Sequence, residues 1–293
     1  MPMNSELKPK IRFKGFTDDW EQRKAKELCS ITTGKSNTQD QVQDGKYPFY
    51  IRSDVPVRSN RYLYDEEAVI TIGDGNIGRV FHYVNGKFDL HQRCYKMADF
   101  KALTAKYFYY YFSTKFYERA MSMTAKATVD SVRLEMISDM EIKFPKDTTE
   151  QTIISELLTN LDNLITLHQR KCDKLVELKK SLLEKMFPQN NSVIPEIRFK
   201  GFTNDWEQRK LKELCNIFDG THQTPNYTDS GIMFLSVENI KDLKSEKYIS
   251  YDDFKNNFRI YPEKNDILMT RIGDIGTTNI VKGSTLKAYY VSL

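Results

Sequence analysis

Basic and amide side chains are concentrated in the segments of this chain that are rich in Gly, Asn and Pro, where they alternate with Tyr, Ser and Thr. Arg, Asn and Gln can hydrogen-bond in pairs to the edges of nucleobases, and Lys, Ser and Thr hold phosphates. A single such residue is more often an ordinary solvated side chain, so the hypothesis concerns the group. The candidate binding residues in the first half of the chain are Lys35, Arg52, Arg58, Arg61, Arg79, His91, Gln92 and Arg93. Those in the second half are Thr221, His222, Gln223, Asn239 and Arg271.

Signatures of catalysis are missing from the sequence. It contains no Walker A motif, no Asn-Pro-Pro-Tyr or Asp-Pro-Pro-Tyr of the amino-methyltransferases, and no nucleophile–histidine arrangement that stands out. Gly73–Gly78 fits GxGxxG, but the following RVFHYVNG predicts a strand instead of a helix that could hold a pyrophosphate. We therefore interpret these glycines as turn formers. The pattern favours a non-catalytic binding protein.

Cysteine and histidine spacing predicts no metal site. The 4 cysteines lie far apart without a CxxC, and the 4 histidines show no ligand spacing. We expect free, buried thiols in a reducing compartment. The N-terminus lacks the apolar core of a signal peptide and no run is long enough for a membrane span, so we expect a cytoplasmic protein without membrane contact. The net charge of +4 permits a polyanionic partner.

One segment occurs twice in the chain. PKIRFKGFTDDWEQRKAKELCSI, from Pro9 to Ile31, returns as PEIRFKGFTNDWEQRKLKELCNI, from Pro195 to Ile217. The separation is far longer than a solenoid period of roughly 20–50 residues, so a domain-sized unit is duplicated. Two domains with different preferences would not share their reading residues, and we therefore expect this repeated segment to be scaffold. The differing pairs are Lys10/Glu196, Asp18/Asn204, Ala25/Leu211 and Ser30/Asn216.

A second match supports the duplication. Ala68–Gly78 (AVITIGDGNIG) parallels Asp266–Gly276 (DILMTRIGDIG), with Ile-Gly-Asp aligned at Gly73 and Gly273. The region between the two matches is longer in the second copy. The frame thus repeats while the loops differ, as expected for two readers with different specificities.

A long helix is predicted between the two copies. From Asp147 to Phe187 the chain has no Gly or Pro, and Pro188 ends it. About 38 residues at 1.5 Å each give a rod of roughly 55 Å. Asp147 and Glu150 have the spacing of a capping box. Apolar residues repeat at steps of four and three, which indicates a coiled-coil seam. The seam positions are Ile154, Leu158, Leu161, Ile165, Leu175 and Leu182.

The predicted fold class is α/β (mixed α+β), with globular domains joined by this coiled-coil-type helix. Short strands are expected between Tyr47 and Leu90, and a helix at Ala105–Arg119. We expect a first domain at 1–146, the helical spacer at 147–188, a linker at 189–194, and a second, incomplete domain at 195–293.

The whole chain resembles the specificity subunits of type I restriction–modification systems. The resemblance rests on the repeated segment, on Thr270–Gly276 (TRIGDIG), and on Ala127–Pro145 leading into the long helix. It implies two target-recognition domains that each read one half of a split double-stranded DNA sequence, held apart by helical spacers. It also implies modification subunits that bring S-adenosylmethionine and restriction subunits that use ATP and magnesium, so the chain itself binds no cofactor.

The chain departs from that family's pattern after Leu293, where the rest of a second domain and a second spacer would follow. Without that spacer the leucine seam would face water, so we expect it to be covered by a second copy of the chain or by modification subunits. Two alternatives stay open. One is a protein-interaction scaffold that uses the coiled coil, and the other is a small DNA-modifying enzyme with an unrecognised site.

Overall fold

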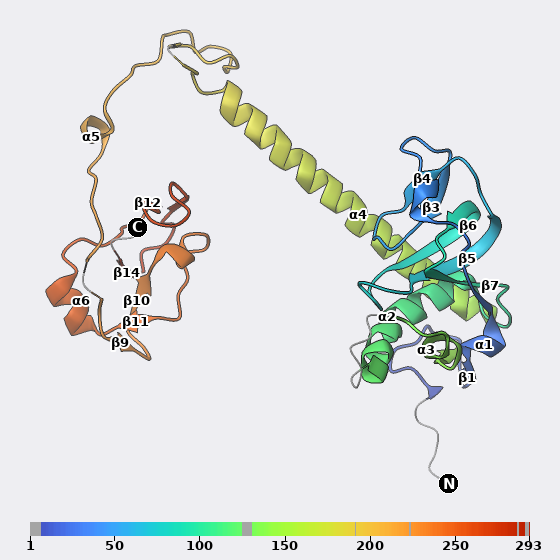
Figure 1. The fold of residues 1–293 in the computed structure, drawn as a ribbon. Helices are drawn as coiled ribbons and strands as arrows, with labels where there is room; N and C mark the ends of the chain where they lie inside the picture. Colours follow the sequence, from blue (N-terminus) through green and yellow to red (C-terminus); the bar gives the residue numbers. More distant parts are fainter. Residues whose placement is uncertain (1–6, 125–130, 191, 223, 286, 291–292) are drawn as a thin grey trace. The chain divides into compact units, whose positions relative to one another are not determined.

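The computed structural model describes residues 7–124, 131–190, 192–222, 224–285, 287–290 and 293. The chain divides into two compact units, Met1–Lys180 (unit 1) and Ser181–Leu293 (unit 2). Each unit is described by itself below. Helices and strands are mixed in both, as the sequence predicts (Figure 1).

Unit 1 is built on a six-stranded sheet with the order β2-β7-β5-β6-β3-β4. All its strand pairs are antiparallel except β3 with β6. The central strand β5 is covered on both faces, because five successive residues from Ala68 to Ile72 are buried. The strands are β2 (Ser30–Thr33), β3 (Tyr47–Tyr50), β4 (Val57–Ser59), β5 (Tyr64–Ile72), β6 (Phe81–Leu90) and β7 (Cys94–Ala98).

Helix α2 (Ala105–Thr124) covers one face of this sheet and confirms the helix predicted at Ala105–Arg119. Phe108, Phe112 and Phe116 recur every fourth residue and are fully buried, so they form one apolar stripe. The ring of Phe81 on β6 meets Phe112 edge-on, at a centroid distance of 5.5 Å. This stripe is the centre of the larger core.

The first copy of the repeated segment is part of the same core. It forms β1 (Glu21–Lys24), which pairs antiparallel with β8 (Glu141–Phe144), and the short helix α1 (Ala25–Leu28). Helix α3 (Leu134–Ser138) precedes β8. Ala25 and Leu28 are fully buried. In unit 1 the C-terminal half of the repeated segment is therefore part of the packed core.

Helix α4 (Thr148–Lys185, 38 residues) is the predicted long helix. The Asp147 carboxylate accepts a hydrogen bond from the Thr149 N–H at 2.7 Å and caps it. The expected capping box is wrong at Glu150. Its carboxylate is fully buried and receives two hydrogen bonds from Arg12, at 2.7 and 2.8 Å. A charge buried this deeply needs such a partner more than the helix end needs a second cap.

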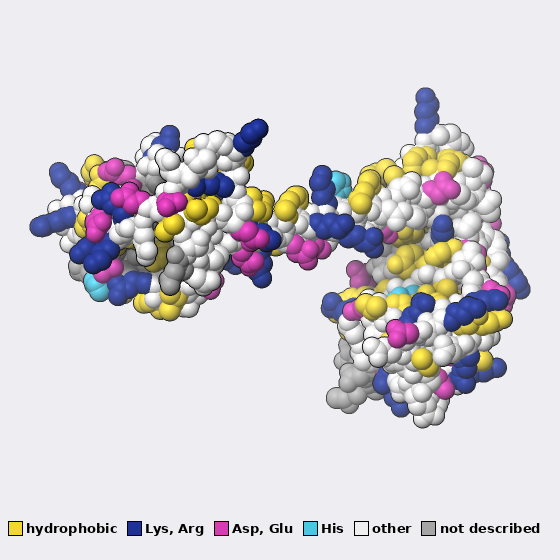
Figure 2. All heavy atoms as spheres, turned by 90° about the horizontal axis from the view of Figure 1, so that it is seen from above, with side chains coloured by type: hydrophobic (Ala, Val, Ile, Leu, Met, Phe, Trp, Pro, Cys, Tyr) yellow, Lys and Arg dark blue, Asp and Glu magenta, His cyan; other side chains and the backbone are white. Residues whose placement is uncertain are grey.

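The predicted seam also begins later than expected. Ile154 packs against the core of unit 1, and Leu158 is half-buried. Tyr110 of α2 donates a hydrogen bond to Asp162 at 2.7 Å, which fixes the same turns of α4 to unit 1. Farther along, Leu161, Ile165 and Leu175 are exposed, while Leu182 is half-buried. Hydrophobic side chains lie between charged ones along this part of the helix (Figure 2).

Unit 2 contains a four-stranded sheet with the order β14-β10-β11-β9 and a separate hairpin, β12-β13. Helix α6 (Tyr251–Asn257) packs through Phe254 onto Phe234 and Phe258 in one of its two small cores. Its other elements are α5 (Leu211–Leu214), β9 (Tyr227–Thr228), β10 (Ile232–Leu235), β11 (Tyr248–Ile249), β12 (Ile267–Met269), β13 (Thr278–Ile280) and β14 (Lys287–Tyr289).

The duplication is visible in the sheets. The parallel pair β3–β6 of unit 1 has its counterpart in the parallel pair β10–β14 of unit 2. In each pair the residue after the second strand donates to the end of the first, His91 N to Tyr50 O at 2.9 Å and Tyr290 N to Leu235 O at 3.0 Å. The frame of the two units is thus shared.

The alignment of Gly73 with Gly273 is corrected by the structure. Gly75 and Gly78 have positive φ angles of 83° and 68°, and the matching pair in unit 2 is Gly273 and Gly276, at 75° and 88°. In both turns the isoleucine two residues after the first glycine donates to that glycine's carbonyl, at 2.8 and 3.0 Å. The turns therefore match two residues out of step with the alignment based on Ile-Gly-Asp.

The second copy of the repeated segment is not covered. Leu211, Leu214 and Ile217 are exposed, and Glu207–Lys210 has no strand partner among the described residues. The expectation of buried thiols is wrong for two of four cysteines, since Cys29 and Cys94 are buried but Cys172 and Cys215 are exposed. No group of three or more potential metal ligands occurs in the described part of the chain. None of the helices described is both long and apolar enough to cross a bilayer.

Candidate nucleic-acid interface

Four loops of unit 1 meet at one place. Three of them follow β2, β3 and β5, and the fourth joins β6 to β7. Their backbones are hydrogen-bonded to one another: Gly73 N to Arg93 O at 2.7 Å, and Gln92 N to Ser36 O at 2.9 Å. We call residues 34–37, 51–54, 73–75 and 91–93 the loop cluster.

Two glycines make this convergence possible. A Cβ atom on Gly34 would lie 2.2 Å from the Leu90 carbonyl oxygen, and one on Gly73 would lie 2.5 Å from the Arg93 carbonyl oxygen. Both distances are far inside a normal contact, so any other residue would push the loops apart. Gly220 repeats the arrangement in unit 2, where an added Cβ atom would lie 2.4 Å from the Tyr290 carbonyl oxygen.

The centre of the loop cluster is a carboxylate between two arginines. Asp74 accepts hydrogen bonds from Arg52 Nη1 at 3.2 Å and from Arg93 Nη1 at 2.7 Å. The Asp74 side chain is only 18% exposed, whereas Arg52 and Arg93 are 43% and 61% exposed. Burial raises the pKa of Asp74, but the hydrogen bonds and charges of Arg93 and Arg52 outweigh it and the net pKa is lowered. An ionised carboxylate thus orients two cations whose outer faces reach solvent.

His91 lies beside this group in its neutral form. Burial lowers its pKa, and the charge of Arg52 lowers it further. Its Nδ1 accepts the Arg93 backbone N–H at 3.1 Å, which leaves the proton on Nε2. His91 is buried, so its neutral ring supports the backbone of the loop cluster without adding charge.

Arg61 belongs to a second, more buried network of hydrogen bonds and ion pairs. The fully buried Asp89 accepts from Ser36 Oγ at 2.6 Å and from Arg61 Nε at 3.3 Å, and Asp40 pairs with Arg61 at 2.7 Å. Arg61 is thus held between two carboxylates and anchors the loop after β2. The contacts of Arg61 therefore indicate that it holds this loop in place.

The remaining candidates of the cluster are closer to solvent. The Gln92 side-chain amide donates to Asn37 Oδ1 at 2.5 Å, which fixes its orientation. Lys35 is exposed, and its ammonium makes no hydrogen bond or ion pair with any described residue. The structure therefore brings together Lys35, Arg52, Arg61, His91, Gln92 and Arg93.

Arg58 and Arg79 are engaged outside the loop cluster. Arg58 donates to the carbonyl oxygens of Gly45 and Lys46, at 2.9 and 3.0 Å, and so closes the β3–β4 hairpin. Arg79 lies over the ring of Tyr117 on α2, 4.4 Å from its centroid, and donates to its hydroxyl.

In unit 2 the candidates are less concentrated. Arg271 pairs with Asp219 at 3.1 Å, and Thr221 bridges to Tyr290. Asn239 accepts the Ser236 N–H at 2.9 Å and donates to the Lys244 carbonyl, so it stabilises a turn. His222 is exposed, and Gln223 lies outside the described residues.

Sequence reasoning missed the carboxylates that hold the arginines. The GxGxxG pattern places Asp74 in a turn, and no motif marks Asp40 or Asp89. The only signal is that each carboxylate lies beside a glycine turn or strand end near an arginine-bearing loop, which is not specific.

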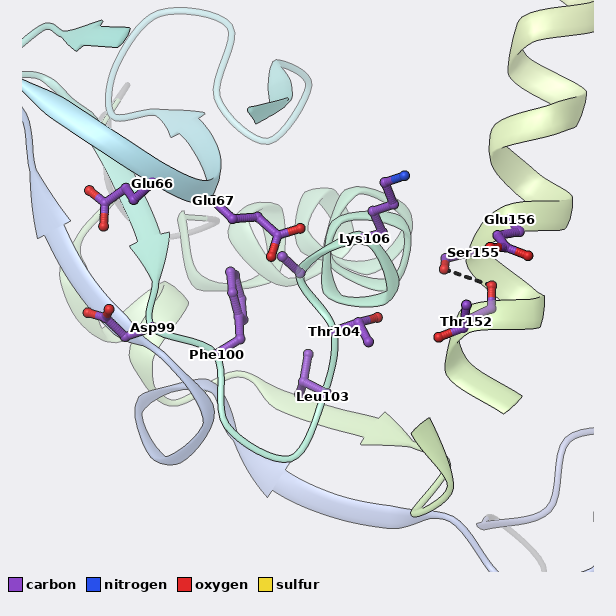
Figure 3. Close-up of a pocket in the computed structure, with 11 residues that line it drawn as sticks. Glu66, Glu67, Asp99, Phe100, Leu103, Thr104, Lys106, Thr152, Ser155 and Glu156 are labelled. Carbon is purple, nitrogen blue, oxygen red and sulfur yellow. Dashed lines mark hydrogen bonds between the residues drawn. The ribbon is translucent and has the colours of Figure 1, made fainter. Parts of the chain in front are cut away.

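A hollow of about 510 Å³ lies elsewhere on unit 1 (Figure 3). Glu66, Glu67, Asp99 and Glu156 line it, with Lys106 as its only cation. Glu66 and Glu67 are near the start of β5, whereas Asp74 follows its end, and at ~3.3 Å per residue the two places are roughly 25 Å apart along the strand. The acidic lining does not suit a polyanion, so the loop cluster is the better candidate.

Comparisons with known proteins agree on one family. The family model of the type I restriction modification DNA specificity domain matches residues 17–177. The type I restriction enzyme EcoDI specificity subunit of Escherichia coli is 24% identical over 209 residues, covering 68% of this chain and 46% of its own length. The MjaVIII specificity subunit of Methanocaldococcus jannaschii is 24% identical over 242 residues, covering 76% of this chain and 56% of its own length. The chain thus spans about half the length of these relatives.

A solved structure has the same fold. The type I restriction–modification S subunit from M. genitalium aligns with a TM-score of 0.57 at 16% identity, over 97% of this chain and 73% of that one. The family model covers more than half of the 293 residues. This protein therefore belongs to the type I restriction modification DNA specificity domain family.

Proposed function

We propose that this chain recognises double-stranded DNA as the specificity component of a type I restriction–modification complex and directs methylation and cleavage by partner subunits to a split target. The observation that carries this proposal is the pair Arg52 and Arg93 fixed on Asp74, at a place where four loops meet in a chain of this family. The mechanism is base readout by the loop cluster.

The arrangement suits readout because its side chains are oriented before DNA arrives. An arginine can donate two hydrogen bonds to guanine, and an amide can pair with adenine. Asp74 limits the rotamers of both arginines, and Asn37 limits those of Gln92, so less entropy is lost on binding. Lys35, exposed at the rim, is placed for a phosphate.

The chemistry belongs to partners in this proposal. The chain binds no cofactor itself and is not catalytic, whereas modification subunits bind S-adenosylmethionine and restriction subunits use ATP and magnesium. The exposed leucines of α4 support a docking role for that helix. Access to chromosomal DNA places this activity in the cytoplasm.

Mapping of genomic methylation tests the proposal and the target together. We expect a split motif to be methylated in cells with the gene and unmethylated without it. The Arg93→Ala variant should relax one base of the motif, and Arg58→Ala, whose guanidinium closes a hairpin, should not. An unchanged methylation pattern in the absence of the gene would contradict the proposal.

The alternative of a protein-interaction scaffold is favoured by the exposed apolar side chains of α4. The salt dependence of binding distinguishes the DNA-recognition proposal from the scaffold alternative. Affinity through phosphate contacts falls steeply with ionic strength, and affinity through an apolar face falls little.

A further inference from the structure

We propose that the Arg93 side chain reads a guanine from the major groove, a specificity that rests on the DNA recognition proposed above. Arg93 lies in the loop between β6 and β7, and its side chain is 61% exposed, so a ligand can reach it. The atoms that the loop cluster leaves open around Arg93 match the edge of one base only.

Both arginines at the centre of the loop cluster keep two donor groups open. Asp74 accepts from Nη1 of Arg93 at 2.7 Å and from Nη1 of Arg52 at 3.2 Å. Nε and Nη2 of each guanidinium make no hydrogen bond with any described residue. These two groups lie along one edge of the planar guanidinium, which is the geometry of bidentate hydrogen bonding. Arg93 presents this edge more openly, since Arg52 is only 43% exposed.

The acceptors next to these donors are already used. The Asp74 side chain is 18% exposed, and its two oxygens hold both arginines. Oδ1 of Asn37 accepts from the Gln92 amide at 2.5 Å. The exposed carboxylate of Asp54 lies on the His82 side of its loop, where its charge acts on that ring. A base that approaches the two arginines therefore meets donors.

Guanine is the base that answers donors with two acceptors side by side. It presents N7 and O6 in the major groove, whereas adenine and cytosine present an amino donor there and thymine has a single acceptor beside a methyl group. Nε and Nη2 of Arg93 match N7 and O6. An amino group in the same place would face the arginine donors without an acceptor, which is costly once water is excluded. The half-site of unit 1 should therefore contain a guanine.

Asp74 disfavours the two other ligands that an arginine takes from DNA, a phosphate and the minor groove. Its ionised carboxylate lies 2.7 Å from Nη1 of Arg93 and would repel a phosphate brought to the same guanidinium. The narrow minor groove has a strongly negative potential, which the same carboxylate would meet. The neutral major-groove edge of a base avoids both repulsions.

The first test selects duplexes from a random-sequence library with the full chain and with two variants. The parent chain should enrich a motif with a guanine at a fixed place in one half. Arg93→Ala should lose the preference at that guanine alone, which amounts to roughly 5- to 150-fold in affinity. Lys35→Ala, whose exposed ammonium has no partner among the described residues, should keep the motif and flatten the salt dependence of binding.

The second test changes single atoms of that guanine. 7-Deazaguanine lacks N7 in the major groove, and inosine lacks the amino group in the minor groove. 7-Deazaguanine should weaken binding by the parent chain severalfold. It should leave binding by Arg93→Ala unchanged, because the variant has already lost the same contact. Inosine should change neither chain.

The outcomes separate the guanine assignment from DNA recognition itself. A parent chain that enriches no sequence would contradict both. A parent chain that enriches a motif, while Arg93→Ala alters no position or a position other than guanine, would overturn the guanine assignment alone. Equal weakening of both chains by 7-deazaguanine would overturn it as well. Weakening by inosine alone would overturn the assignment to the major groove.

Discussion

The two copies of the repeated segment have the same local structure in opposite environments. Both form a four-residue helix preceded by an extended lysine, with ψ of 146° at Lys24 and 138° at Lys210. Both end with a cysteine N–H bonded to the first residue of the helix, at 3.0 and 3.1 Å. Yet Leu28 is 0% exposed and Leu214 is 62% exposed. Local sequence therefore determines the helix, and a distant element determines whether it is buried.

Deleting the matched leucines should give the largest difference between the copies. Leu28→Ala removes a fully buried side chain and should lower the free energy of unfolding of unit 1 by about 2–5 kcal/mol. Leu214→Ala should change unit 2 by less than about 0.5 kcal/mol. Each unit contains one tryptophan, so urea unfolding of Trp206→Phe and Trp20→Phe backgrounds reports the units separately. Equal losses of unfolding free energy in the two units would contradict the difference in burial between the two leucines.

Replacing the matched arginines, Arg12 and Arg198, should give a smaller difference in stability between the two units. Arg12→Ala leaves the buried Glu150 carboxylate unpaired and should cost unit 1 about 3 kcal/mol, at the lower end for a buried pair because Arg12 keeps some exposure. Arg198→Ala removes a side chain without a hydrogen-bonded carboxylate and should cost little. The same fluorescence measurements apply, and Arg12→Ala/Glu150→Gln should recover part of the loss. No recovery would show that Arg12 acts through packing alone.

The loops extend the comparison to binding. Asp74→Asn and Asp219→Asn remove the same charge, but Asp74 orients two arginines and Asp219 contacts one exposed arginine. Both should strengthen non-specific DNA binding slightly. Only Asp74→Asn should reduce discrimination against a wrong base, by about 1–3 kcal/mol. Competition binding with matched and mismatched duplexes measures this, and an equal effect of both variants would rule out the orienting role.

Acid should produce the smallest effect. Because the pKa of Asp74 is lower in the folded chain than its ordinary value of 3.8, its ion pairs stabilise the fold above that value and are lost as pH falls through the lowered pKa. The difference in unfolding free energy between the parent and Asp74→Asn should therefore be constant at neutral pH and shrink below pH 3.8. If this difference in unfolding free energy instead grew in acid, the lowered pKa of Asp74 would be contradicted.

Elements that depend on local sequence were predictable, and contacts between distant residues were not. Helix α4 follows from its heptads and from Pro188, and α2 from its spaced aromatics. The pairing of Glu150 with Arg12 joins residues 138 positions apart, so no local pattern reveals it.

In the candidate site, too, the contacts between distant residues were not predictable from the sequence. The sequence predicts Arg52 and Arg93 as candidates, whereas the pattern around Asp74, which holds both, indicates only a turn. Arg58 and Arg79 have the same residue type as Arg52, and only tertiary contacts separate them.

The two cysteines at one repeat position allow the most direct test of the central claim, that one segment is buried in unit 1 and open in unit 2. Burial raises the pKa of Cys29 to about 12, with a smaller contribution from Asp99. Cys215 is exposed. Alkylation of the native chain with a maleimide at pH 8, followed by mass spectrometry of the peptides, should label Cys215 within minutes and Cys29 only after unfolding. Equal protection of both cysteines, or equal labelling, would contradict the account.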